Sequence, residues 1–140
     1  MAAELHLVKL CVGAESIADL QAWQSSRIKA GYVPLTHVTR MWPRRSNELL
    51  DGGSLYWVIK GVVLVRQSIL GFDPHTGDDG IERCGIVLDP ELVRTRAQPR
   101  RPFQGWRYLK GTDAPNDLTD QSTEDLPPTL AAELSAIGVR

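Results

Sequence analysis

The apolar positions near the start of the chain form first a strand-like run and then a helical pattern. Residues 5–12 (LHLVKLCV) are almost continuously apolar and rich in β-formers, which predicts a short strand covered on both faces. Ser16 follows, with Asp19 three residues later, as in a helix-starting capping box. Apolar side chains then recur at helical spacing as far as Gly31, so the pattern predicts one early amphipathic helix with Trp23 on its buried face.

The remaining apolar segments are short and lie between glycines and prolines, as is typical of strands. They predict strands at 35–42, 55–61, 62–72, 81–89 and, as a continuation, 91–98, with a helical turn at 46–51 and a loop at 73–80. Residues 55–72 form either two strands that meet at Gly61 or one long strand bent there. One helix followed by about five strands, without βαβ alternation, predicts an α+β fold with a mostly antiparallel sheet that curls into a small barrel.

Composition is that of an ordinary globular protein, with 42% hydrophobic and 24% charged residues. No apolar run reaches the roughly 18 residues that a membrane span requires, and the first residues do not have the pattern of a signal peptide. Cys11 and Cys84 stand far apart in apolar surroundings. They indicate buried reduced thiols, with a disulfide or a reactive cysteine as the alternative. We therefore expect a cytoplasmic protein.

Charge divides the chain into two parts. Residues 1–110 hold 15 Lys and Arg against 11 Asp and Glu, whereas residues 111–140 hold one against six. We expect a β-barrel domain over 1–110, followed over 111–140 by an acidic linker and a short C-terminal helix that packs on the same domain. That helix would dock through Leu130, Leu134 and Ile137 and let the tail compete with an anionic ligand. The alternative is a free extension that keeps the protein soluble.

Two segments combine arginines with aromatic side chains, namely HVTRMWPRR (37–45) and RRPFQGWRYLK (100–110). Arginine binds phosphates and stacks on bases, and Trp and Tyr offer flat faces for base stacking. The two segments are therefore predicted to lie side by side and to bind nucleic acid, RNA more than DNA. The candidate residues are Arg40, Trp42, Arg44, Arg45, Arg100, Arg101, Trp106, Arg107 and Tyr108. Alternatively, Phe103 and Trp106 pack as a lid and the arginines are simply solvated.

The evidence for catalysis is weaker. His37 and Thr39 form an H-x-T sequence, but the two-histidine phosphoesterase chemistry needs a second copy, which the chain lacks. The three histidines are scattered and no glycine-rich phosphate loop is present, so we expect no metal and no cofactor. An enzyme that hydrolyses a modified nucleoside or nucleotide is an alternative, with His37, Thr39 and Lys60 converging on one pocket. A protein-interaction domain is a third.

The sequence motifs also carry a resemblance. LHLVKLCVGAESIADLQAW, HVTRMWPRR, ELLDGGSLYWVIKG and RRPFQGWRYLK together resemble a bacterial, largely proteobacterial, domain of unknown function. More remotely, LVK (7–9), ESIADL (15–20) and residues 44–64 resemble EVE domains, which belong with ASCH domains in the PUA-like superfamily. That resemblance implies a small pseudobarrel that binds RNA or a modified base in a cleft beside the early helix. Leu35 stands where ASCH hydrolases place a lysine, which disfavours their reaction.

Overall fold

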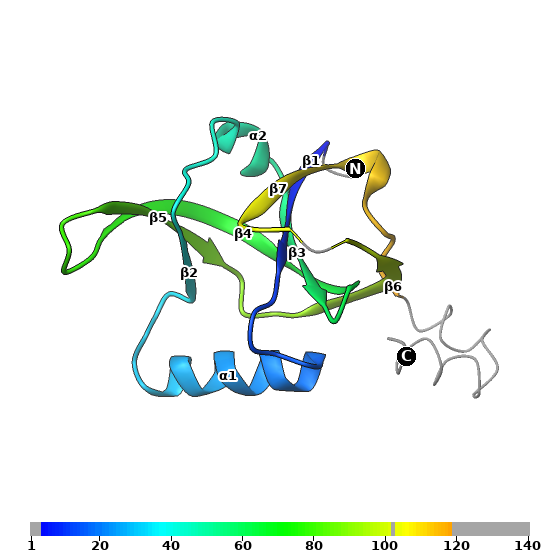
Figure 1. The fold of residues 1–140 in the computed structure, drawn as a ribbon, viewed down its shortest axis with the longest axis horizontal. Helices are drawn as coiled ribbons and strands as arrows, with labels where there is room; N and C mark the ends of the chain where they lie inside the picture. The colour runs from blue at the N-terminus through cyan, green and yellow to red at the C-terminus, as the bar shows by residue number, and fades with distance from the viewer. Residues whose placement is uncertain (1–3, 102, 119–140) are drawn as a thin grey trace.

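The computed structural model describes residues 4–101 and 103–118. In chain order the elements are β1 (Leu5–Leu10), α1 (Ile17–Lys29), β2 (Thr36–Thr39), α2 (Ser46–Leu49), β3 (Ser54–Ile59), β4 (Val62–Thr76), β5 (Glu82–Leu88), β6 (Val93–Pro99), β7 (Trp106–Lys110) and the 3₁₀ turn η1 (Gly111–Asp113). Figure 1 shows α1 below the strands and the β4–β5 hairpin extending away from the body. The described residues thus form a mostly β fold with two helices, which agrees with the predicted α+β class. No helix within the described ranges is long and apolar enough to cross a membrane.

The seven strands form one mixed sheet with the order β2-β5-β4-β3-β1-β7, and β6 pairs with β4. The β1–β3 pairing is parallel, and the other five pairings are antiparallel. The long β4 belongs to both halves of the sheet, because its first part pairs with β3 and β6 and its second part with β5. The sheet is not closed into a barrel, since its end strands β2 and β7 share no ladder of backbone hydrogen bonds in the described residues.

The chain reverses between β3 and β4 at Lys60 and Gly61, which both have positive φ angles (51° and 80°). Positive φ at both central residues is the geometry of a tight hairpin turn. Residues 55–72 are therefore two strands that meet at Gly61. The predicted loop at 73–80 is shorter than expected, because β4 continues to Thr76.

Side chains on the two faces of the sheet form two apolar clusters. The larger one includes Leu7 of β1, Leu55 and Trp57 of β3, and the partly buried Trp106 and Tyr108 of β7. The smaller one, on the opposite face of the same strands, contains Val8, Tyr56, Val58, Val63 and Leu109. This arrangement explains the continuous apolar run at the start of the chain, because successive residues of a strand point to opposite faces and both faces here are covered.

The predicted cap of α1 is confirmed, since Ser16 Oγ accepts a hydrogen bond from the Asp19 backbone N–H at 3.1 Å. The predicted burial of Trp23 is wrong, because this side chain is 50% exposed. The helix buries Leu20 and Gln24 instead, which lie one turn apart on the same side. Gln24, the residue after Trp23, faces the sheet because its side chain has a polar partner there.

That partner is Gln67 of β4. The two side-chain amides exchange hydrogen bonds, each of 2.9 Å, and Gln67 Oε1 also accepts from the Trp57 indole N–H at 2.8 Å. Gln67 Nε2 further donates to the Asp89 carbonyl at 3.0 Å. The Gln24 and Gln67 amides, the Trp57 N–H and the Asp89 carbonyl are therefore all paired. This network fixes both the position of α1 and the orientation of Trp57.

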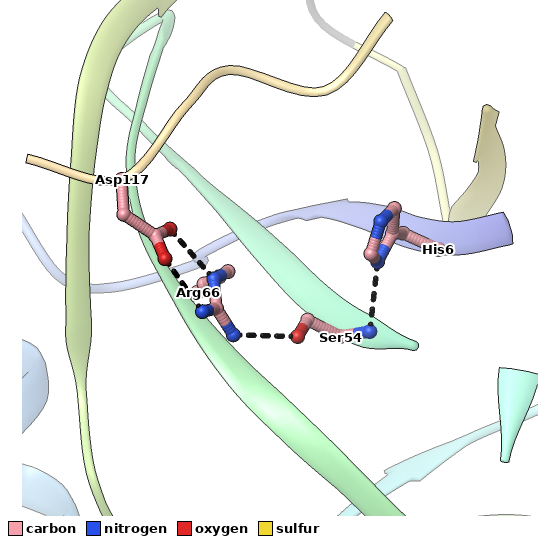
Figure 2. A network of polar contacts seen from close by, with 4 residues as sticks. All are labelled: His6, Ser54, Arg66 and Asp117. Carbon is pink, nitrogen blue, oxygen red and sulfur yellow. Dashed lines mark hydrogen bonds and ion pairs between the residues drawn. The ribbon is translucent and has the colours of Figure 1, made fainter. Parts of the chain in front are cut away.

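The segment after β7 folds back onto the sheet. Asp117 forms a β-bridge with Thr95, and its carboxylate accepts two hydrogen bonds from the Arg66 guanidinium, at 2.8 and 2.7 Å. Arg66 also donates to Ser54 Oγ at 2.9 Å, and the Ser54 backbone N–H donates to His6 Nδ1 at 3.0 Å (Figure 2). Residues 111–118 thus pack on the body. The expected C-terminal helix, with Leu130, Leu134 and Ile137, lies outside the described residues.

Candidate functional site

The two open ends of the sheet are joined by side chains from β7. The Trp106 indole N–H donates to the Met41 carbonyl at 3.1 Å, and the Tyr108 hydroxyl accepts from the Arg45 backbone N–H at 3.2 Å. The Met41 carbonyl and the Arg45 N–H both belong to the segment that links β2 to α2. The predicted contact between the two basic-aromatic segments is therefore confirmed. We call this surface the seam, and its residues are Met41, Trp42, Arg45, Trp106 and Tyr108.

The seam presents aromatic rings and a cation together. Trp106 and Tyr108 pack edge to face with ring centroids 5.0 Å apart, and the Arg45 guanidinium lies 5.7 Å from the Tyr108 ring centroid. Arg45 is also held by a two-pronged ion pair with Glu48, at 2.6 and 2.7 Å. Trp42 is 41% exposed, and its ring packs against the ring of Phe72 of β4. The rings are thus fixed in place while parts of their surfaces stay accessible.

Two further arginines flank the seam. Arg40 and Arg44 lie exposed on the same linking segment and form no ion pair with any described residue. Their guanidinium groups are therefore available to an anion from solvent, whereas Arg45 would exchange its exposed ion pair with Glu48 for such an anion.

The other predicted arginines lie apart from the seam. Arg107 occupies the β7 position between Trp106 and Tyr108, so strand alternation directs it to the opposite face. There its guanidinium covers the Phe103 ring at 5.4 Å and donates to the Gln104 carbonyl. Arg100 lies beside the β3–β4 turn, where its backbone N–H donates to the Gly61 carbonyl, and Arg101 follows it. Arg107 thus lies on the face of the sheet opposite to Trp106 and Tyr108.

A cavity of about 280 Å³ opens beside α1. It is bounded by the end of β1, the residues that lead into α1, one side of the helix, and single side chains from β2 and β3. Its lining residues are Lys9, Leu10, Cys11, Val12, Gly13, Ala14, Asp19, Leu20, Trp23, His37 and Trp57. Two indoles, one imidazole, one ammonium and one carboxylate therefore surround a space with otherwise apolar walls.

His37 contributes the imidazole of the cavity wall. Its ring packs edge to face on Trp57 at 5.0 Å, and its Nε2 atom is buried without a hydrogen-bond partner in the described part of the chain. Burial, together with the positive charges of Lys9 and Arg27, lowers the pKa of His37 to about 4. Burial likewise lowers the pKa of Lys9. At neutral pH the cavity wall therefore includes an uncharged imidazole beside the Lys9 side chain.

The cavity and the seam lie on the same face of the sheet. In the strand register Lys9 is paired with Trp57 of β3 on one side and with Trp106 of β7 on the other. Residues directly paired across strands point to the same face, so these three side chains form a row. Lys9 and Trp57 line the cavity and Trp106 belongs to the seam. Lys9 therefore stands between a residue of the cavity wall and a residue of the seam.

The polar residues expected for an enzyme do not converge. His37 lines the cavity, but Thr39 is buried and its hydroxyl donates to the Met41 carbonyl at 3.0 Å. Lys60 stands at the β3–β4 turn, exposed and 3.4 Å from a carboxylate oxygen of Glu15. Neither lines the cavity. The arrangement that the hydrolase alternative requires is thus not found among residues 4–101 and 103–118.

Fold and site together define an α+β protein with an open, curled sheet and a cavity lined by aromatic and cationic groups beside its first helix. Residues 7–140 match the family described as "Protein of unknown function (DUF1489)". The chain therefore belongs to this family, as its motifs indicated. No curated protein and no solved structure matches the chain.

Proposed function

We propose that this protein is a binding module for single-stranded RNA or a modified nucleobase, built on a PUA-like fold. One base enters the cavity beside α1, and the adjoining strand runs along the seam. The observation that carries the proposal is the strand pairing of Lys9, which lines the cavity, with Trp106 of the seam on one face of the sheet. Such a role belongs in the cytoplasm, where RNA is available to the protein.

The cavity suits a single flat heterocycle. Its volume lies near the lower end of the range for small-molecule sites, which fits one base and excludes a stacked pair. Trp23, which is 50% exposed, supplies a ring surface for stacking, and the buried Trp57 forms part of the cavity wall. The free His37 Nε2 could exchange a hydrogen bond with the edge of a base, since leaving that atom unpaired in a buried site costs free energy that a ligand would recover.

The seam suits the backbone and the neighbouring bases. Arg40, Arg44 and Arg45 are exposed cations on one short segment, and Trp42 and Tyr108 lie beside them. Phosphate contacts by three arginines predict a slope of about −2 for the logarithm of the binding constant against the logarithm of salt concentration, at about −0.7 per contact on single strands. Cavity binding of an uncharged base alone would be almost independent of salt.

The experiment is a fluorescence-anisotropy titration with a labelled, mixed-sequence RNA of about ten nucleotides at several salt concentrations. The double variant Arg44→Ala/Arg45→Ala should lower the magnitude of the salt slope by about 1.4, for two lost contacts. The matched control is Arg94→Ala/Arg96→Ala, which removes the same charge from exposed positions on β6, away from the seam. Equal losses in both variants would indicate unspecific charge attraction, and no binding by the wild type at low salt would refute the proposal.

A further inference from the structure

A second aromatic site lies at the mouth of the cavity. The Arg27 guanidinium lies over two rings, 5.1 Å from the centroid of Trp23 and 4.7 Å from the centroid of Tyr32. Trp23 lines the cavity, whereas Tyr32 is 60% exposed just beyond the end of α1. We call this arrangement the Trp23–Arg27–Tyr32 stack.

The backbone holds the stack in position. Trp23 and Arg27 lie four residues apart on α1 and therefore on the same side of the helix. Gly31 ends the helix with a φ of +98°, and the Tyr32 backbone N–H then donates to the Arg27 carbonyl at 3.0 Å. This turn brings the Tyr32 ring back over the guanidinium. The three planar groups are thus arranged before any ligand binds.

The stack leaves aromatic surface in solvent, which packing alone does not explain. A cation–π contact at an exposed site is weak, and half-exposed Trp and Tyr side chains are typical of recognition surfaces. The charge around the stack is also suited to a nucleotide. Arg27 is close enough to lower the pKa of His37, and Lys29 lies exposed in the same last turn of the helix.

We propose that the Trp23–Arg27–Tyr32 stack is a second base-binding subsite. It takes the base adjacent to the one in the cavity, by stacking on Tyr32, while Arg27 and Lys29 face the phosphate between the two nucleotides. The inference rests on the proposed function and adds the direction of the strand, which leaves the cavity along the end of α1 as well as toward the seam. The subsite recognises any base, because stacking uses the ring face common to all four.

The test compares ligands of two lengths by NMR titration, using the four ribonucleoside 5′-monophosphates and mixed-sequence RNA trinucleotides. Tyr32→Ala should weaken trinucleotide binding about fivefold to a hundredfold, the usual effect of one lost stacking contact. It should leave monophosphate binding within about twofold, because a single base occupies the cavity. Tyr32→Phe keeps the ring and should bind like the wild type. Since Tyr32 is largely exposed, neither variant should impair folding.

Each other result has a separate meaning. Trinucleotide binding that is weakened by Arg44→Ala/Arg45→Ala but unchanged by Tyr32→Ala would overturn the subsite and leave the proposed function standing. Equal weakening of both ligands by Tyr32→Ala would also overturn it, because the ring would then be part of the cavity. Failure of the wild type to bind any trinucleotide would overturn both proposals.

Discussion

Replacing Gln67 with leucine should destabilise the fold strongly, although leucine is close to glutamine in size. Gln67 is fully buried. Its side chain forms both hydrogen bonds to Gln24, and these two bonds join α1 to the sheet. It also accepts the hydrogen bond from the Trp57 indole. Gln67→Leu therefore leaves three groups without partners, namely the Gln24 amide, the Trp57 N–H and the Asp89 carbonyl.

The size of the effect follows from these unpaired groups. A buried donor or acceptor that loses its partner costs about 1–3 kcal/mol. The Trp57 N–H is enclosed, so the loss of its hydrogen bond has the full energetic effect. The Asp89 carbonyl lies near the surface and can form a hydrogen bond with water instead. The apolar leucine side chain regains part of the loss by burial. We expect a net decrease in the free energy of unfolding of about 3 kcal/mol, a large effect for one substitution.

Urea unfolding followed by far-UV circular dichroism measures this change. Gln21→Leu is the matched control, since Gln21 is exposed on the same helix and should change the free energy of unfolding by less than about 0.5 kcal/mol. The double variant Gln24→Leu/Gln67→Leu should lose less than the two single variants combined, because each removes the other's partner. A loss below about 1 kcal/mol for Gln67→Leu would refute this reasoning about the network.

Three further substitutions test single features. Burial holds the pKa of His37 at about 4, below the value of about 6.5 in unfolded chains. As the pH falls, the unfolded state thus binds the proton first, so the free energy of unfolding of the wild type should decrease from about pH 6.5 to pH 4. Urea unfolding of His37→Gln should show a smaller decrease over this range, and parallel curves for the two proteins would contradict the lowered pKa. Asp117→Asn should cost about 1 kcal/mol at pH 7, after allowance for solvent screening of a partly exposed pair. Because Arg66 lowers the pKa of Asp117, this difference should vanish as the pH falls below about 4, and a constant difference would contradict the ion pair. Trp106→Phe should cost about 1 kcal/mol by removing the hydrogen bond to Met41, and unchanged thermal unfolding would show that the seam contributes nothing to stability.

Local signals in the sequence predicted most of the secondary structure. The capping residue Ser16 marked the start of α1, and short apolar runs between glycines and prolines marked the strands. The contact between the two basic-aromatic segments was also predictable, from their matching chemistry. These predictions succeed because capping, turns and strand periodicity depend on residues that are close in the chain.

Features that depend on long-range pairing were not predictable in this way. Trp23 was assigned to the core by its apolar character, because nothing nearby in the sequence shows that Gln24 meets Gln67 across 43 residues. The residues that line the cavity were not predictable for the same reason, since Lys9 and Trp57 become neighbours only through the parallel β1–β3 pairing. One signal was available in advance. A lysine inside an otherwise apolar strand needs a particular environment, and here that environment is the cavity.

An NMR titration of the ¹⁵N-labelled protein with a short single-stranded RNA would most directly test whether the cavity and the seam bind one strand. The four tryptophan indole N–H groups report on it, because Trp23 and Trp57 line the cavity and Trp42 and Trp106 belong to the seam. We expect all four signals to shift together with the same dissociation constant, more weakly at high salt. Four signals that stay unchanged at low salt, or shifts confined to the β4–β5 hairpin, would contradict the proposed function.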